Sequence, residues 1–309
     1  MEASHFVLTL GEHPMDHGEL CRVLTALDRR YECLQLGILG KSILGRELFL
    51  ARIGHGEKNL VLVGTHHGME WITTLLLCRF LYELCDGIEK KRTLYRMPLA
   101  QVPEAYTLHF IPMLNPDGVE YQIHSPDPSH PLYPRLLSMN GGSTDFSHWQ
   151  ANARGVDLNH NYNAGFLEYK LYEREHKIPC GAPTLYSGTS PESEPETAAL
   201  CSYLRMLGRV DLLLSLHTQG EEVYYSSGGQ IPRHSEAILW QILDKSGYTP
   251  AVAHGSAAFG GLLDFSIRTL GIPAFTIECG KGKNPLPLSD AGAIYQRLRE
   301  VFFTLPRMV

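Results

Sequence analysis

A histidine and a glutamate stand three residues apart directly after an apolar segment of the chain. The residues are His67 and Glu70, within the run GTHHGMEW at 64–71. An imidazole nitrogen and a carboxylate oxygen are both zinc ligands, and this spacing lets the two side chains converge on one cation. A His-x-x-Glu pair alone is a weak signal, since chance and solvated surface side chains produce most such matches. Its meaning depends on residues elsewhere in the chain.

Two further residues of the same chemical kinds stand at the ends of apolar segments. His217 follows the run LLLSL at 212–216, and Glu278 follows the run AFTI at 274–277. Ligands of open α/β sheets bind outside the carboxyl ends of the strands, so we expect both side chains in that crevice. A carboxylate directly after an apolar run is costly to bury unless it has a partner or a task.

Together these residues predict a catalytic zinc site with one zinc ion per chain. His67, Glu70 and His217 provide three protein ligands and leave a fourth position open, whereas structural zinc sites are closed and usually rich in cysteine. Zinc in such a site lowers the pKa of bound water to about 7 and so makes water a nucleophile. Glu278, the remaining carboxylate, is then expected to accept the proton and to donate it to a leaving amine.

The segments that carry these residues indicate an α/β fold with helices on both faces of a sheet. A capping box formed by Ser193 and Glu196 is expected at the start of one helix. The stretch between 125 and 163 is rich in Gly, Pro, Asn and Ser and is expected to form a functional loop. Buried strands are predicted at 59–64, 106–112, 212–216 and 274–277, and helices near 71–84, 191–205 and 290–303.

Composition and charge exclude several classes of protein. The 309 residues are 44% hydrophobic and 19% charged, and 27 Lys and Arg against 33 Asp and Glu give a net charge of −6. Such a chain can bury a large core, which excludes a disordered protein. The acidic balance argues against a nucleic-acid partner. No membrane partner is expected either, because the longest apolar stretch, at 71–84, is shorter than the ~20 residues of a span.

The organisation of the chain predicts one catalytic domain over 1–309. No linker, repeat or low-complexity tract divides the sequence, and residues 1–36 read as a helical lead-in that is too short for an inhibitory pro-segment. We see no basic cluster followed by an apolar run at the start, so no signal peptide is expected. The seven cysteines form no C-x-x-C pair and are interpreted as free thiols in a reducing cytoplasm. The oligomeric state is left open.

Blocks of sequence resemble the zinc metallocarboxypeptidase family of carboxypeptidase A type. They are GTHHGMEWIT at 64–73, NPDG at 115–118 and GVDLN at 155–159, in the order of the family, whose motifs cover about 37–290. The resemblance implies a single α/β domain with a mixed, twisted, eight-stranded sheet and with zinc at the strand ends.

The same resemblance implies roles for individual residues. The metal ligands are implied to be His67, Glu70 and His217, and the general base Glu278. Asn159 falls on the position that binds the terminal carboxylate of the substrate. His66, which precedes the first ligand, is expected to lie beside the site without binding the metal.

The chain departs from the family pattern at the arginines that contact the substrate. The family has an arginine after the asparagine, where this chain has His160, and an imidazole lacks the two-pronged contact of a guanidinium with a carboxylate. His160 is still expected to contact the substrate from this position. Gln150 stands where the family has the arginine that polarises the scissile carbonyl. We predict that Arg154, five residues before Asn159, contacts the oxyanion or another substrate anion. A solvated loop arginine is the alternative.

These departures resemble one branch of the family, the γ-D-glutamyl-meso-diaminopimelate peptidases. The matching runs are WQANARGVDLN at 149–159, YSG with PESEPE at 186–196, and GKGKNPLP at 280–287. The resemblance implies hydrolysis of the γ-D-glutamyl-diaminopimelate amide bond in peptidoglycan stem peptides or released muropeptides, without a pro-segment. Three alternatives remain: a zinc deacylase of small N-acyl amino acids, a general metallocarboxypeptidase, and a metal-free domain that binds wall peptides.

Overall fold

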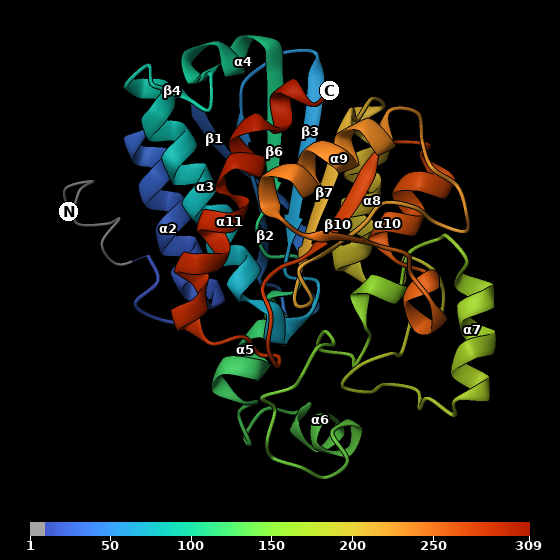
Figure 1. Ribbon diagram of the computed structural model, residues 1–309. Coiled ribbons are helices and arrows are strands. Elements are labelled where there is room, and N and C mark those ends of the chain that lie inside the picture. The colour runs from blue at the N-terminus through green and yellow to red at the C-terminus, as the bar shows by residue number, and fades with distance from the viewer. Residues whose placement is uncertain (1–9) are drawn as a thin grey trace.

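An eight-stranded sheet runs through the centre of the computed structural model, which describes residues 10–309 (Figure 1). From edge to edge the strands are β1 (Leu34–Lys41), β2 (Glu47–Ile53), β6 (Tyr106–Ile111), β3 (Lys58–Gly64), β7 (Leu212–His217), β10 (Ala274–Glu278), β8 (Glu222–Tyr224) and β9 (Thr249–Ala251). The β6–β3, β3–β7, β7–β10 and β8–β9 pairs are parallel, and the other three are antiparallel. The sheet is therefore mixed, which confirms the fold class.

Helices cover both faces of the sheet, as predicted. One face packs through a large apolar cluster against α2 (His17–Arg30), α3 (Ile72–Glu89), α9 (Ser235–Ser246) and α11 (Ala291–Thr304). The opposite face packs through a second cluster against α8 (Pro195–Leu207) and α10 (Leu262–Asp264). The remaining elements are α4 (Val102–Ala105), α5 (Pro116–His124), α6 (Tyr133–Met139), α7 (Phe166–Glu175) and a hairpin of β4 (Thr93–Leu94) and β5 (Met97–Pro98).

Strand β3 shows why an unbroken apolar run forms a central strand. Leu60 and Leu62 point into the first apolar cluster, whereas Val61 and Val63 point into the second. A strand that helices cover on both faces buries every position, so its sequence has no alternation of apolar and polar residues. The same holds for β7, all of whose residues are buried.

The carboxyl ends of three adjacent parallel strands meet at one edge of the sheet. Gly64 at the end of β3 pairs with Leu216 of β7, and His217 at the end of β7 pairs with Glu278 of β10. Residues at and just after these three ends are therefore neighbours, although they are far apart in sequence. In Figure 1 this edge faces the lower part of the view, toward α5.

The predicted capping box of α8 is wrong. The helix begins at Pro195 with Glu194 as its N-cap, and the N-cap side chain makes no capping bond. Ser193 instead donates its hydroxyl hydrogen to Glu194, and Glu196 accepts a hydrogen bond from the backbone N–H of Ile43. The fixed φ of a proline suits the first helical position, which explains why the helix starts there.

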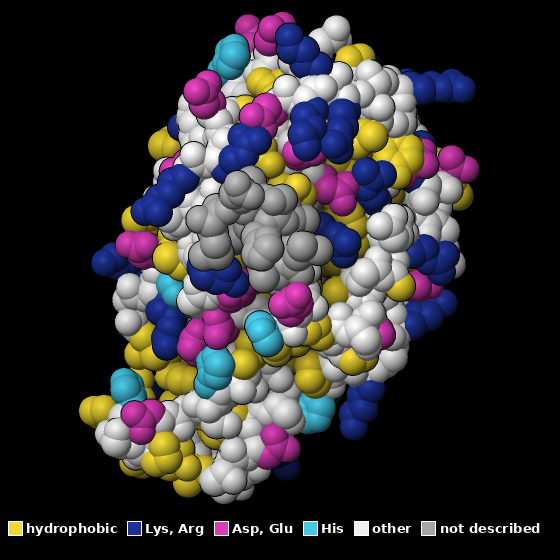
Figure 2. All heavy atoms as spheres, turned by 90° about the vertical axis from the view of Figure 1, so that its left-hand side faces the viewer, with side chains coloured by type: hydrophobic (Ala, Val, Ile, Leu, Met, Phe, Trp, Pro, Cys, Tyr) yellow, Lys and Arg dark blue, Asp and Glu magenta, His cyan; other side chains and the backbone are white. Residues whose placement is uncertain are grey.

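Helix α2 lies within the predicted lead-in at 1–36, of which residues 1–9 lie outside the described part of the chain. The surface that includes α2 carries basic and acidic side chains side by side (Figure 2). The stretch at 125–163 is mostly irregular but includes α6 and a 3₁₀ turn at Leu158–His160. None of the helices within residues 10–309 has the length and apolar character needed to cross a membrane.

Candidate active site

The ends of β3 and β7 bring together two histidines and a glutamate. His67 follows β3 and precedes the short turn that carries Glu70, and His217 is the last residue of β7. One ligand atom from each side chain lies within 4.8 Å of the other two. Glu70 Oε1 is 2.8 Å from His67 Nδ1, and Glu70 Oε2 is 3.1 Å from His217 Nδ1. The two histidines thus face the carboxylate through the same ring nitrogen.

The donor set fits a catalytic zinc ion. Two imidazole nitrogens and one carboxylate are a known catalytic combination that leaves a position open for water or substrate. The side chains of Glu70 and His217 are 3% and 2% exposed, and that of His67 is 13% exposed. Burial opposes the charge of Glu70, but His67 and His217 outweigh it and hold the pKa of Glu70 below its usual value. Glu70 is therefore ionised at neutral pH, as a carboxylate ligand of zinc must be.

Asp157 orients the ring of His67. His67 Nε2 lies 3.2 Å from Asp157 Oδ1, and Asp157 Oδ2 accepts a hydrogen bond of 3.0 Å from the backbone N–H of Leu185. A carboxylate beside Nε2 keeps the hydrogen on that nitrogen and leaves Nδ1 free to bind a metal. Burial opposes the charge of Asp157, yet His67 and His160 keep its pKa low. Sequence spacing carries no signal for this contact, which joins two distant loops.

Asn115 and two glycines fix the turn that carries the ligands. The Asn115 Nδ2 group donates to the carbonyl oxygens of His66 and Gln150, each at 2.9 Å, and the N–H of Gly68 also donates to Gln150. A Cβ atom at Gly68 would lie 2.4 Å from the carbonyl of Gly118, so a larger residue has no room. The two sequence blocks at 64–73 and 115–118 therefore pack directly against each other.

Glu278 lies beside the ligand group at the end of β10. It is the direct partner of His217 on β7 in the sheet register. Burial raises its pKa well above the usual value, and the neighbouring charges of Glu70 and Glu222 raise it further. His66 is buried, its Nε2 lies 2.8 Å from the hydroxyl oxygen of Tyr162, and its ring stacks on that of His217 with the centroids 5.1 Å apart.

Comparison with known proteins identifies the family. Residues 20–304 match the sequence model of the zinc carboxypeptidases. The chain belongs to this family. A relative, gamma-D-glutamyl-L-diamino acid endopeptidase 1 of Lysinibacillus sphaericus, is 30% identical over 295 residues, which are 96% of this chain and 73% of that protein. An uncharacterised protein of Bacillus subtilis is 30% identical over 261 residues, which are 83% of this chain and 68% of that protein.

Solved structures of the family share the fold. Thrombin-activatable fibrinolysis inhibitor superposes with a TM-score of 0.72 at 20% identity, over 99% of this chain and 75% of that protein's chain. The murein-tripeptide amidase of Escherichia coli superposes with a TM-score of 0.53 at 20% identity, over 88% of this chain and 91% of its own. The protein is thus a zinc metallopeptidase with one catalytic zinc, as predicted, and not a metal-free binding domain.

In this zinc carboxypeptidase the two residues predicted to contact the substrate, Asn159 and His160, differ in their surroundings. Asn159 Oδ1 accepts a hydrogen bond of 3.1 Å from the N–H of Leu262, which orients the amide and turns Nδ2 the other way. The ring of His160 is only 9% exposed and stacks on Tyr169 with the ring centroids 4.0 Å apart. Its Nδ1 lies 3.1 Å from the carbonyl oxygen of Phe259. His160 is therefore a buried side chain whose ring is held by Tyr169 and Phe259.

Arg154 lies on a loop and is half exposed. Its guanidinium Nη1 is 3.6 Å from a carboxylate oxygen of Glu194, and its side chain is 51% exposed. Gln150, at the position of the missing arginine, accepts a short hydrogen bond from the hydroxyl of Thr184. The backbone oxygen of Gln150 also receives the N–H of Gly68, so Gln150 borders the turn that carries the metal ligands.

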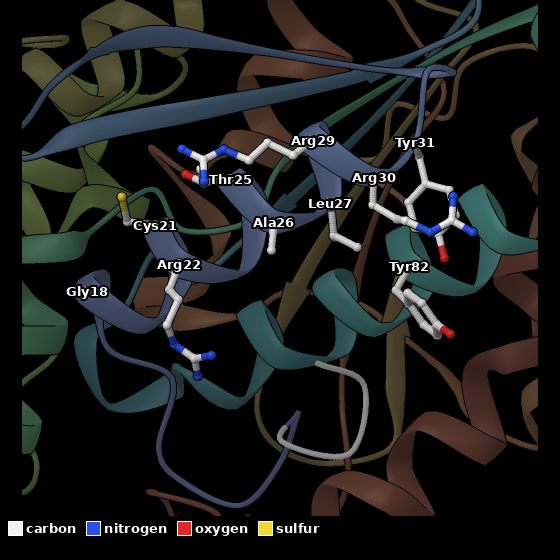
Figure 3. A pocket seen from close by; sticks show the side chains of 10 residues that line it. All are labelled: Gly18, Cys21, Arg22, Thr25, Ala26, Leu27, Arg29, Arg30, Tyr31 and Tyr82. Carbon is white, nitrogen blue, oxygen red and sulfur yellow. The ribbon is translucent and has the colours of Figure 1, made fainter. Parts of the chain in front are cut away.

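A separate hollow lies on the outer side of α2 (Figure 3). The residues that line it include Arg22, Arg29 and Arg30 of α2. Tyr82 of α3 lies at one end, near Tyr31. None of the residues predicted for metal binding, catalysis or substrate contact lines this hollow.

Proposed function

We propose that this chain hydrolyses the amide bond between γ-D-glutamate and a diamino acid, with diaminopimelate in stem peptides or released muropeptides as the natural substrate. The observation that carries the proposal is its 30% identity, over 96% of the chain, with gamma-D-glutamyl-L-diamino acid endopeptidase 1. The absence of arginine at Gln150 and His160 supports it, because a substrate with several charged groups can be oriented by other contacts.

His67, Glu70 and His217 are the proposed zinc ligands, through Nδ1 of each histidine and the carboxylate of Glu70. When bound, zinc lowers the pKa of a coordinated water and polarises the scissile carbonyl. Asp157 holds His67 in the tautomer that presents Nδ1 to the metal. Glu278 is the register partner of His217, so we expect the scissile amide to bind between the metal and Glu278.

Glu278 is the proposed general base and acid. Its carboxylate accepts a proton from the attacking water, and the resulting carboxyl group donates that proton to the departing amine nitrogen. Burial and the charge of Glu70 raise the pKa of Glu278, which favours a carboxyl group that can hold the proton between the two steps. The same side chain therefore serves both halves of the reaction.

The proposed substrate contacts are made by Asn159 and Arg154. Asn159 Nδ2 would donate to a substrate carboxylate, since Oδ1 is already bound to the N–H of Leu262. Arg154 would pair with an anionic group of the peptide, beside Glu194, or contact the oxyanion. His160 is buried behind Asn159, so we propose that it shapes the substrate site by holding this loop in place.

We further propose that the enzyme acts in the cytoplasm on released muropeptides. All seven cysteines are free thiols, and Cys78, Cys85, Cys201 and Cys279 are buried without a disulfide. Disulfides are rare in reducing compartments, which supports this location.

The test is hydrolysis of defined peptides read by mass spectrometry. The substrates are L-Ala-γ-D-Glu-meso-diaminopimelate and the corresponding tetrapeptide, with hippuryl-amino acid and N-acetyl-amino acid compounds as controls. We expect L-Ala-D-Glu to be released from the muropeptides, and the controls to remain intact. Cleavage of the controls alone would contradict the proposal and favour a general carboxypeptidase or a deacylase.

A further inference from the structure

A second carboxylate lies directly across the sheet from the proposed base. Glu222 of β8 and Glu278 of β10 are partners in the antiparallel register of these strands. Residues directly opposite in an antiparallel pair project from the same face of the sheet, with Cβ atoms about 5 Å apart. Like charges in this arrangement destabilise the sheet unless a counter-charge lies near.

The structure shows no such counter-charge for Glu222 within residues 10–309. No Lys, Arg or His nitrogen of this part of the chain lies within 4.0 Å of its carboxylate. The hydroxyl of Tyr224, two residues along the same strand face, donates a hydrogen bond of 3.1 Å to Glu222 Oε2. This contact holds the carboxylate in place but leaves its charge uncompensated.

The adjacent residue, Glu221, is the opposite case. Its carboxylate is 3.1 Å from Lys281 Nζ and 3.2 Å from an Arg297 guanidinium nitrogen, so its charge is neutralised by the protein itself. The chain thus pairs one of two consecutive glutamates internally and leaves the other beside the active site. Glu221 is a matched control for Glu222.

The position of Glu222 assigns it to one side of the scissile bond. Across the sheet the order of side chains is His217 on β7, Glu278 on β10 and Glu222 on β8. In the proposed reaction the scissile carbonyl lies toward His217, and Glu278 protonates the departing nitrogen. Glu222, on the far side of Glu278, therefore lies next to the residue that departs as the amine.

We propose that Glu222, held by Tyr224, binds the second ammonium group of a diamino acid on the leaving side of the substrate. This inference rests on the proposed function. A diamino acid has one nitrogen in the scissile amide and carries the other as an ammonium group on its side chain. That ammonium supplies the positive charge that Glu222 lacks, through a charge-assisted hydrogen bond.

The experiment compares two matched substrates, L-Ala-γ-D-Glu-L-Lys and L-Ala-γ-D-Glu-L-norleucine, which differ in the side-chain ammonium group. The wild-type enzyme is expected to favour the lysine peptide by about 10- to 100-fold in kcat/KM, the range of a charge-assisted hydrogen bond. Glu222→Gln is expected to bring this ratio close to one, and Glu221→Gln to keep it. Zinc content and thermal unfolding, measured on all three proteins, verify that each variant is folded and loaded.

The possible failures are distinguishable. Equal kcat/KM values for the two peptides in the wild-type enzyme would overturn the role of Glu222 and leave the proposed function standing. An unchanged preference for lysine in folded Glu222→Gln would overturn it as well. Hydrolysis of neither peptide, nor of the diaminopimelate peptide, would refute the proposed function and this inference together.

Discussion

Replacing Asp157 by Asn tests whether the orientation of His67 controls zinc binding. Asp157 Oδ1 accepts from His67 Nε2 at 3.2 Å, and Oδ2 accepts from the N–H of Leu185 at 3.0 Å. Oδ1 also accepts a hydrogen bond of 3.1 Å from the backbone N–H of Asn159. An asparagine has one oxygen for these three donors. If its NH₂ group faces Leu185, two donors oppose each other. If it faces His67, the N–H of Asn159 loses its acceptor, and the ring hydrogen of His67 must move to Nδ1, which then cannot bind a metal.

Either orientation lowers the affinity of the site for zinc. Loss of a carboxylate that orients a metal-binding histidine costs about 10- to 100-fold in metal affinity, or about 1.4 to 2.7 kcal/mol. The unsatisfied donor also lowers the free energy of unfolding of the metal-free protein by about 1–3 kcal/mol. We expect Asp157→Asn to show both losses.

The assay is competition for zinc with a chromophoric chelator at neutral pH, together with urea unfolding of the metal-free protein. Asp264→Asn is a suitable control, because Asp264 is buried and accepts from the N–H of Gly261 and from the hydroxyl of Ser227, without contact to His67. The control should lose stability and keep its zinc affinity. Wild-type zinc affinity in Asp157→Asn would refute the reasoning.

Two further predictions concern stability and the ligand turn. Burial raises the pKa of Glu196 from 4.5 to about 8. Between pH 4.5 and about 8, the folded state therefore holds a proton on Glu196 that the unfolded state lacks. The free energy of unfolding of the wild type falls as the pH rises through this range. In urea unfolding, the free energy of unfolding of Glu196→Gln should rise relative to that of the wild type by up to about 1.4 kcal/mol per pH unit. The same pH dependence in both proteins would contradict this prediction. Gly68→Ala places a Cβ atom against the carbonyl of Gly118. It should weaken zinc binding and lower the free energy of unfolding by about 1–3 kcal/mol. The control Gly292→Ala, whose Cβ atom lies in open space, should change neither quantity.

The sequence predicts the central strands well because their burial on both faces can be read from consecutive apolar residues. The strands β3, β7 and β10 are largely apolar and show no alternation of apolar and polar residues, and each ends at or near a polar residue of the site. Parallel strands place their carboxyl ends at one edge, so the pattern predicts His217 and Glu278 in the same crevice, whereas their direct pairing depends on the adjacency of β7 and β10. The strands at and next to the edges of the sheet are harder to predict: the edge strand β1 has mostly half-buried or exposed positions, and β8 and the edge strand β9 have three residues each.

The supporting residues of the site could not be predicted from spacing. Asp157 contacts His67 across two loops, and Glu222 faces Glu278 only because β8 lies at the far side of β10. The place of His160 directly after the block at 155–159 predicts it in the substrate site, but the burial of its ring depends on Tyr169 and Phe259. Such contacts are set by tertiary packing and become visible only in the structure.

The central claim is that Glu278 moves protons at a zinc centre held by His67, Glu70 and His217. The most direct measurement determines zinc content and turnover of Glu278→Gln on L-Ala-γ-D-Glu-meso-diaminopimelate in the same preparation. We predict one zinc ion per chain, as in the wild type, and a kcat lower by about 10²- to 10⁴-fold, the usual contribution of a general base. Full zinc content with turnover near that of the wild type would contradict the account.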